Sequence, residues 1–215
     1  MVFALLACAA AIWWVLGREV AEEPDLVGGS LKPRGVDSFW IYEVHDFMED
    51  GSVVVEGQNR ERVIEHRNVD GRRLQLIELE SGQGDDSYVE YIWEFEDESG
   101  IHYWLDHNDP PQLPSDWSLF DLYFPLNVPI GKKIETSSGY TELLAINVQA
   151  TVPAGRFIGN TAQSTYYEDG NPDFRERYTL APGIGLVQYE YDVWMDGEWR
   201  LESRELLRSF ETTPE

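Results

Sequence analysis

Four Asp-Gly pairs divide the chain into runs in which apolar and polar residues alternate. The pairs are Asp50-Gly51, Asp70-Gly71, Asp169-Gly170 and Asp196-Gly197. Asp-Gly between alternating runs is the strongest short-range signal of a β-hairpin, because both residues tolerate a positive φ. The sequence therefore predicts at least three hairpins and an antiparallel sheet over residues 38–215.

The same alternation indicates how the strands are buried. Tyr91, Trp93 and Phe95 alternate with glutamates at positions 90, 94 and 96, which predicts one buried face and one solvent-exposed face. Residues 74–79 and 143–148 instead carry apolar side chains at both parities. We expect those two strands to be covered on both faces.

One segment departs from the strand pattern. Residues 115–123 begin with a capping serine, Ser115, after Pro114 and have apolar residues at helical spacing, which predicts one short helix. About twelve short strands are too many for a flat sheet with one exposed face. We therefore expect a mainly β fold, a single curved antiparallel sheet or partial β-barrel with one short helix. A two-sheet sandwich is the alternative.

An apolar leader precedes the predicted sheet. Residues 2–16 are apolar without interruption and would span about 22 Å as a helix, short of the roughly 30 Å core of a bilayer. Residues 1–17 are therefore expected to be a signal peptide or a short membrane anchor. Residues 18–37 have several Pro and Gly among charges and are expected to form a flexible tether to a β-rich domain over residues 38–215.

The single cysteine, Cys8, lies inside this leader. Leu5-Leu-Ala-Cys8 resembles the lipobox of bacterial lipoproteins, in which the cysteine is acylated, and this resemblance makes Cys8 the candidate lipidation site. A lipidated leader and a signal anchor both stay open. Either one predicts an extracytoplasmic, membrane-tethered protein in the periplasm or at the cell surface, and residues 38–215 have no thiol with which to form a disulfide.

The charge balance excludes some partners. The formal net charge is −24, and no cluster of Lys and Arg exists to contact phosphates, which argues against nucleic acid and against an anionic membrane surface. The only lysines are Lys32, Lys132 and Lys133. An acidic, lysine-poor surface is typical of salt-loving organisms, and an ordinary acidic envelope protein is the alternative.

Two clusters contain residue types that bind metals. His102, Asp106, His107 and Asp109 could supply nitrogen and oxygen ligands, but the two histidines have opposite strand parity and the spacing matches no established motif. Residues 169–173 copy the first half of a calcium loop, but Phe174 stands where that loop needs glycine. A solvated turn and a hairpin turn are the preferred interpretations, and we predict no metal.

Signs of catalysis are similarly weak. Glu94, Glu96, Asp97 and Glu98 form a run of like charge, which usually marks a wet face rather than an acid–base pair. The Gly183-Ile-Gly185 segment lacks the third glycine of a nucleotide cradle, and no Gly-x-Ser-x-Gly elbow is present. We predict no catalytic residues and no cofactor.

Aromatic residues are the one feature that points toward a ligand. If several of them line a cavity in a curved sheet, they could receive an acyl chain or stack on a sugar ring. The alternative is that they fill a wide β core. The candidate cavity residues are Trp93, Trp104, Tyr189 and Tyr191.

Three turn segments resemble a group of bacterial envelope proteins. They are Tyr123-Phe-Pro-Leu-Asn-Val-Pro-Ile-Gly131, Val152-Pro-Ala-Gly-Arg-Phe157 and Tyr178-Thr-Leu-Ala-Pro-Gly-Ile-Gly-Leu-Val187. The group consists mostly of domains of unknown function and includes TapB-like lipoproteins. The resemblance covers roughly residues 38–210 and implies a half-barrel similar to those of periplasmic lipoprotein carriers. It implies no catalytic residues.

These observations lead to a functional hypothesis and two alternatives. We expect a non-enzymatic, membrane-tethered envelope domain whose concave face binds an apolar small molecule or docks an envelope protein. The first alternative is a structural or assembly protein that docks a partner through a sheet edge. The second is a metal-dependent hydrolase that uses His102, Asp106 and His107.

Overall fold

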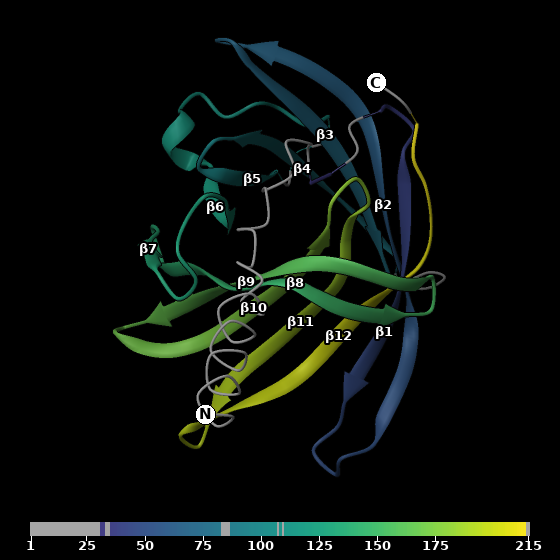
Figure 1. Ribbon diagram of the computed structural model, residues 1–215, viewed down its shortest axis with the longest axis vertical. Coiled ribbons are helices and arrows are strands. Elements are labelled where there is room, and N and C mark those ends of the chain that lie inside the picture. Colours follow the sequence, from purple (N-terminus) through teal and green to yellow (C-terminus); the bar gives the residue numbers. More distant parts are fainter. Residues whose placement is uncertain (1–30, 33–34, 83–86, 107, 109, 214–215) are drawn as a thin grey trace, which may run out of the picture.

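A computed structural model describes residues 31–32, 35–82, 87–106, 108 and 110–213 (Figure 1). The predicted leader, with Cys8, and most of the predicted tether lie outside the described residues. Within the described ranges no helix has the length and apolar character needed to cross a membrane.

Twelve strands make up most of the described chain. They are β1 Phe39–Phe47, β2 Val53–Val69, β3 Arg72–Ser81, β4 Tyr88–Asp97, β5 Gly100–Asp106, β6 Asp121–Pro125, β7 Lys133–Glu135, β8 Gly139–Val152, β9 Gly155–Glu168, β10 Asn171–Ala181, β11 Gly185–Met195 and β12 Glu198–Glu211. All belong to one antiparallel sheet in the order β6-β5-β4-β3-β2-β1-β12-β11-β10-β9-β8-β7.

The first and last strands pair at the middle of this sheet. The chain therefore forms two meanders, β1–β6 and β7–β12, which extend in opposite directions from the β1–β12 pair. The sheet coils until β6 lies against β8 and β9, where the Thr141 hydroxyl donates to the Leu122 carbonyl at 3.1 Å. Figure 1 shows the two halves as purple-to-teal and green-to-yellow ribbons. The predicted single curved antiparallel sheet is confirmed, and the sandwich alternative is not what forms.

The Asp-Gly pairs form the turns predicted for them. Each of the four connects consecutive antiparallel strands. In three of them both residues have positive φ: 51° and 80° at Asp70-Gly71, 51° and 80° at Asp169-Gly170, and 55° and 87° at Asp196-Gly197. This is the backbone geometry of two-residue hairpin loops, whose twist matches that of the flanking strands.

The predicted helix is reduced to a single 3₁₀ turn, η2, at Trp117–Leu119. Its N-cap is Asp116, whose side chain accepts from the Ser118 amide, rather than Ser115. Residues 121–123 of the predicted helix belong instead to β6, which pairs with β5. Pairing with the end of a nearly complete sheet outweighs the weak helical pattern of so short a segment.

Two apolar clusters lie on opposite faces of the sheet. The larger one is enclosed between the two halves and includes Trp40, Tyr42, Phe124, Leu180 and Leu207. The smaller one lies on the outer face of β3–β5 beneath the segment around η2. Residues 74–77 are consequently buried at both parities, as predicted, whereas residues 144–148 are only half-buried or exposed because β8 has two register shifts there.

Two of the quoted turn segments dock onto distant strands. The Ala154 amide, in the β8–β9 turn, donates to the Leu207 carbonyl of β12 at 2.9 Å. The Trp40 indole of β1 donates to the Ile184 carbonyl in the β10–β11 turn at 2.6 Å. Next to it, Gly185 has φ +98°, and a Cβ there would stand 3.2 Å from Cγ of Lys32. The β10–β11 turn therefore connects the two halves of the sheet, whereas the β8–β9 turn docks within the second half.

Candidate functional site

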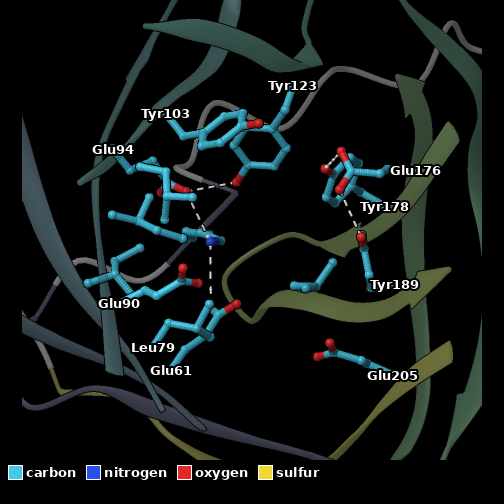
Figure 2. A pocket seen from close by; sticks show the side chains of 15 residues that line it. Glu61, Leu79, Glu90, Glu94, Tyr103, Tyr123, Glu176, Tyr178, Tyr189 and Glu205 are labelled. Atoms are coloured by element: carbon cyan, nitrogen blue, oxygen red, sulfur yellow. Dashed lines mark hydrogen bonds and ion pairs between the residues drawn. The ribbon is translucent and has the colours of Figure 1, made fainter. Parts of the chain in front are cut away.

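A cavity of about 330 Å³ opens on the concave side of the sheet between the two halves (Figure 2). Strands β2 to β6 supply one wall and β10 to β12 the other. The fifteen lining residues are Lys32, Glu61, Ile77, Leu79, Glu90, Ile92, Glu94, Tyr103, Leu105, Tyr123, Glu176, Tyr178, Leu186, Tyr189 and Glu205. The described part of the walls thus combines aliphatic side chains with tyrosines and glutamates, and it contains one cationic side chain.

Glu94 is the centre of a buried hydrogen-bonded network. One of its oxygens accepts from the Lys32 ammonium at 3.0 Å and from the Tyr123 hydroxyl at 2.7 Å. Its other oxygen accepts from the Gln75 amide, and a second carboxylate, Glu61, lies 3.7 Å from the same ammonium. Burial by itself lowers the pKa of Lys32, but attraction to Glu94 and Glu61 more than offsets this, so its pKa is raised and the ammonium stays charged.

Glu176 forms a second carboxylate position on the opposite wall. Its two oxygens accept from the hydroxyls of Tyr178 at 2.6 Å and Tyr189 at 2.8 Å. Burial, and then the Glu176 charge, raise the pKa of both tyrosines well above the ordinary value, so both stay protonated donors. No Lys, Arg or His of the described residues pairs with Glu176, which leaves its negative charge facing the cavity.

Glu205 is a third carboxylate, and it is poised to titrate near neutrality. Burial and then repulsion from Glu61 raise its pKa to about 7, although the Asn59 amide donates to it at 2.8 Å. Burial also raises the pKa of Glu61, against the attraction of Lys32. The charge of the cavity therefore becomes more negative between about pH 6 and pH 8.

Tyrosine rings connect the two carboxylate walls. Tyr123 packs edge-on against Tyr103 at 5.4 Å and against Tyr178 at 5.0 Å between ring centroids, and Tyr178 lies 5.4 Å from Tyr189. Figure 2 shows these rings around the space between Glu94 and Glu176. Aromatic faces attract cations, so they reinforce the preference that the carboxylates impose.

The pKa of Glu205 leads to a prediction about stability. Because its pKa in the folded protein lies above the ordinary 4.5, the folded state holds its proton more tightly, and stability is lost as pH rises through about 7. Between pH 5 and pH 8, the free energy of unfolding of Glu205→Gln should rise by about 2 kcal/mol relative to that of wild type; this figure allows for the partial exposure of Glu205. Urea unfolding at both pH values measures this, with Glu202→Gln, exposed on the same strand, as the control. A pH-independent difference would contradict the assignment.

The aromatic residues predicted to line a cavity do not all face it. Tyr189 lines it, and Tyr191 lies opposite Glu176 in the β10–β11 register but is not a lining residue. Trp93 is fully buried in the cluster on the outer face, and Trp104, its partner in the β4–β5 register, packs against that cluster. The apolar parity of β4 thus faces away from the cavity, and the glutamate parity faces into it.

The histidine and carboxylate cluster separates along β5. His102 stacks on Phe95 at 4.7 Å and lies 3.4 Å from Asp97, at the β4–β5 turn. Asp106, about 13 Å further along the strand, accepts from the Gln112 amide. His107 and Asp109 lie outside the described residues. Within the described part of the chain, no three His, Cys, Asp or Glu side chains are placed to hold a metal ion.

The other two candidate segments have structural roles. Asp169 and Gly170 form the β9–β10 hairpin turn, in line with the preferred interpretation of the calcium-like segment. The run of carboxylates at 94–98 divides: Glu94 is 4% exposed inside the cavity, whereas Asp97 accepts from Ser99 in the β4–β5 turn. Four charged residues of the cavity, Lys32, Glu61, Glu176 and Glu205, carry no motif that the sequence could have revealed.

Comparison with known proteins gives few neighbours. No protein-family model and no curated protein sequence matches the chain, so the resemblance to TapB-like lipoproteins stays a prediction. Among solved structures, one similar chain is described as a "putative exported protein with YmcC-like fold" from Bacteroides fragilis, with a TM-score of 0.48, 12% identity, and coverage of 86% of this chain and 100% of that one. A "putative lipoprotein" from Parabacteroides distasonis gives a TM-score of 0.47, 12% identity, and 85% and 99% coverage. Identity this low transfers no activity or ligand to this chain.

Proposed function

We propose that this chain is a non-enzymatic, membrane-tethered domain of the bacterial envelope whose cavity binds a small ligand with an apolar body and a positively charged group. The apolar leader with Cys8 supports the membrane tether and the extracytoplasmic location. The observation that supports the ligand class is the pair Glu176 and Glu205, which line the cavity with no cationic partner among the described residues.

The balance of charge in the cavity favours a cation. Among the described residues, five glutamates line it against a single ammonium, and carboxylates removed from water gain more from a positive partner than exposed ones do. An anionic ligand such as a fatty acid would meet repulsion from the same groups. The aliphatic side chains of Ile77, Ile92 and Leu105 provide a surface for the apolar body of the ligand. The proposal therefore narrows the apolar ligand expected from the sequence to one with a cationic group.

Three ligands of equal chain length and different charge test this proposal. Hexylammonium, hexanoate and 1-hexanol are titrated separately into the full-length chain at pH 8, and binding is followed by calorimetry. We expect hexylammonium to bind at least tenfold more tightly than the other two. Equal binding of all three would show that only apolar surface is recognised, and binding of none would overturn the proposal.

A variant inside the cavity and one outside it identify the carboxylates involved. Glu176→Gln keeps the shape of the side chain and should weaken hexylammonium binding about tenfold, because a charge-assisted contact is lost. Glu168→Gln, exposed near the end of β9, should leave it unchanged. Affinity of the wild-type chain should also rise from pH 6 to pH 8 as Glu205 ionises.

A further inference from the structure

Lys32 differs from every other residue that lines the cavity. The other fourteen belong to strands of the sheet, whereas Lys32 precedes β1 and is brought in from outside the sheet. Leu31 and Lys32 are nevertheless only 5% and 7% exposed. Lys32 thus lies in the interior of the domain, although the sequence predicts that residues 18–37 form a flexible tether.

Lys32 has around it the groups that would hold a ligand with an ammonium group and an alkyl chain. Its ammonium is held by Glu94 and Glu61 and lies 5.9 Å from the centroid of the Tyr123 ring. Its alkyl stem passes Gly185, where a Cβ would stand 3.2 Å from Cγ of Lys32. Carboxylates surround the charged end, an aromatic ring lies nearby, and a residue without a side chain leaves room for the stem.

We infer that Lys32 occupies, as a tethered internal ligand, a site for a primary alkylammonium group formed by Glu94, Glu61 and Tyr123, and that free alkylammonium ions compete with it for this site. This inference rests on the proposed function and names its ligand class as primary amines. It also adds regulation, since a ligand that enters this site displaces the segment Leu31–Lys32 and releases it from the interior. Occupancy of the cavity is thereby coupled to the chain that joins the domain to its leader.

Removal of the internal ligand provides the test. Lys32→Ala deletes Cγ, Cδ, Cε and Nζ, which n-propylammonium supplies in the same order. We expect Lys32→Ala to bind n-propylammonium at least tenfold more tightly than wild type, and its melting temperature to rise by several degrees in excess ligand while that of wild type changes little. The neutral analogue 1-propanol should have no such effect. Lys132→Ala, which removes an exposed lysine, should behave as wild type.

The outcomes separate this inference from the proposed function. Equal affinity of wild type and Lys32→Ala for n-propylammonium would overturn the inference, while hexylammonium binding that depends on Glu176 would still support the proposed function. Selective binding to Lys32→Ala that is lost in Lys32→Ala/Glu94→Gln would support the inference, whereas a wild type that bound no amine at all would overturn the competition with Lys32. If Lys32→Ala does not fold in buffer, recovery of folding by n-propylammonium chloride but not by sodium chloride supports the inference, and failure with both overturns it.

Discussion

Replacement of Glu94 by alanine should lower the free energy of unfolding by about 4 kcal/mol at pH 7, because it leaves a buried ammonium without its closest partner. Glu94 is 4% exposed and accepts hydrogen bonds from Lys32, Tyr123 and Gln75. In the variant, Lys32 retains Glu61 at 3.7 Å but loses the closer carboxylate, and two further buried donors lose their acceptor. Urea unfolding followed by tryptophan fluorescence measures the change.

A double variant separates the charge from the packing. Lys32→Met/Glu94→Met removes both charges and keeps much of the volume, and it should recover at least half of the loss, since neutralised buried pairs often cost little. Glu98→Ala, exposed at the β4–β5 turn, should change stability by less than about 0.5 kcal/mol. A loss below about 1 kcal/mol for Glu94→Ala would mean that water, rather than Glu94, solvates the Lys32 ammonium.

The fold follows from local patterns because its turns are encoded locally. Asp70-Gly71 and Asp169-Gly170 adopt the positive φ values that two-residue hairpins need, and strands joined by such turns lie side by side. The curvature of the sheet follows from the number of strands and their twist. The helical pattern of residues 115–123 does not decide their structure, because a segment this short follows the strand edge that it reaches, and this edge is β5.

The site is harder to predict from the sequence because β3 to β5 are buried on both faces. Strand parity then no longer separates a buried face from a solvent-exposed one. On β4 the apolar residue Trp93 packs outward beneath the segment around η2, and Glu94 points into the protein. A sequence pattern of alternating apolar and acidic residues shows that two faces differ, but not which of them is enclosed. Strand parity alone predicts that the apolar side is the inner one, which makes Trp93 and Trp104 cavity residues and places Glu94 on a solvent-exposed face; the structure has the reverse on β4.

Lys32 illustrates a second limit, which concerns contacts between distant residues. It lies among Pro and Gly residues that are typical of a tether, and its partners Glu61 and Glu94 are 29 and 62 positions away in the sequence. No local pattern encodes such a contact. The one available signal is the rarity of lysine. In a chain with so few lysines, one that lies next to the start of the domain is a candidate for a specific ion pair.

Trp40→Ala should lower the free energy of unfolding by about 4 kcal/mol, because Trp40 is 2% exposed at the centre of the sheet and its indole donates to the β10–β11 turn. Trp40→Phe keeps most of the packing but leaves the Ile184 carbonyl without its donor, and should cost about 2 kcal/mol. Trp194→Ala, at a position 36% exposed, should cost less than about 1 kcal/mol. Urea unfolding at pH 7 measures all three. A cost for Trp40→Phe below about 0.5 kcal/mol would show that the indole bond does not hold the turn.

The same turn connects the core to the cavity, because a Cβ on Gly185 would stand 3.6 Å from the Trp40 indole nitrogen and 3.2 Å from Cγ of Lys32. Loosening it at Trp40 should therefore also loosen the alkyl stem of Lys32. The loss in free energy of unfolding for the Trp40→Phe/Glu94→Ala double variant should then be about 1 kcal/mol smaller than the sum of the two single losses. Each single change already disturbs the position of Lys32, so the second change has less left to disrupt. Strict additivity would mean that the turn and the ammonium site are energetically independent, and that Lys32 is positioned by its charge alone.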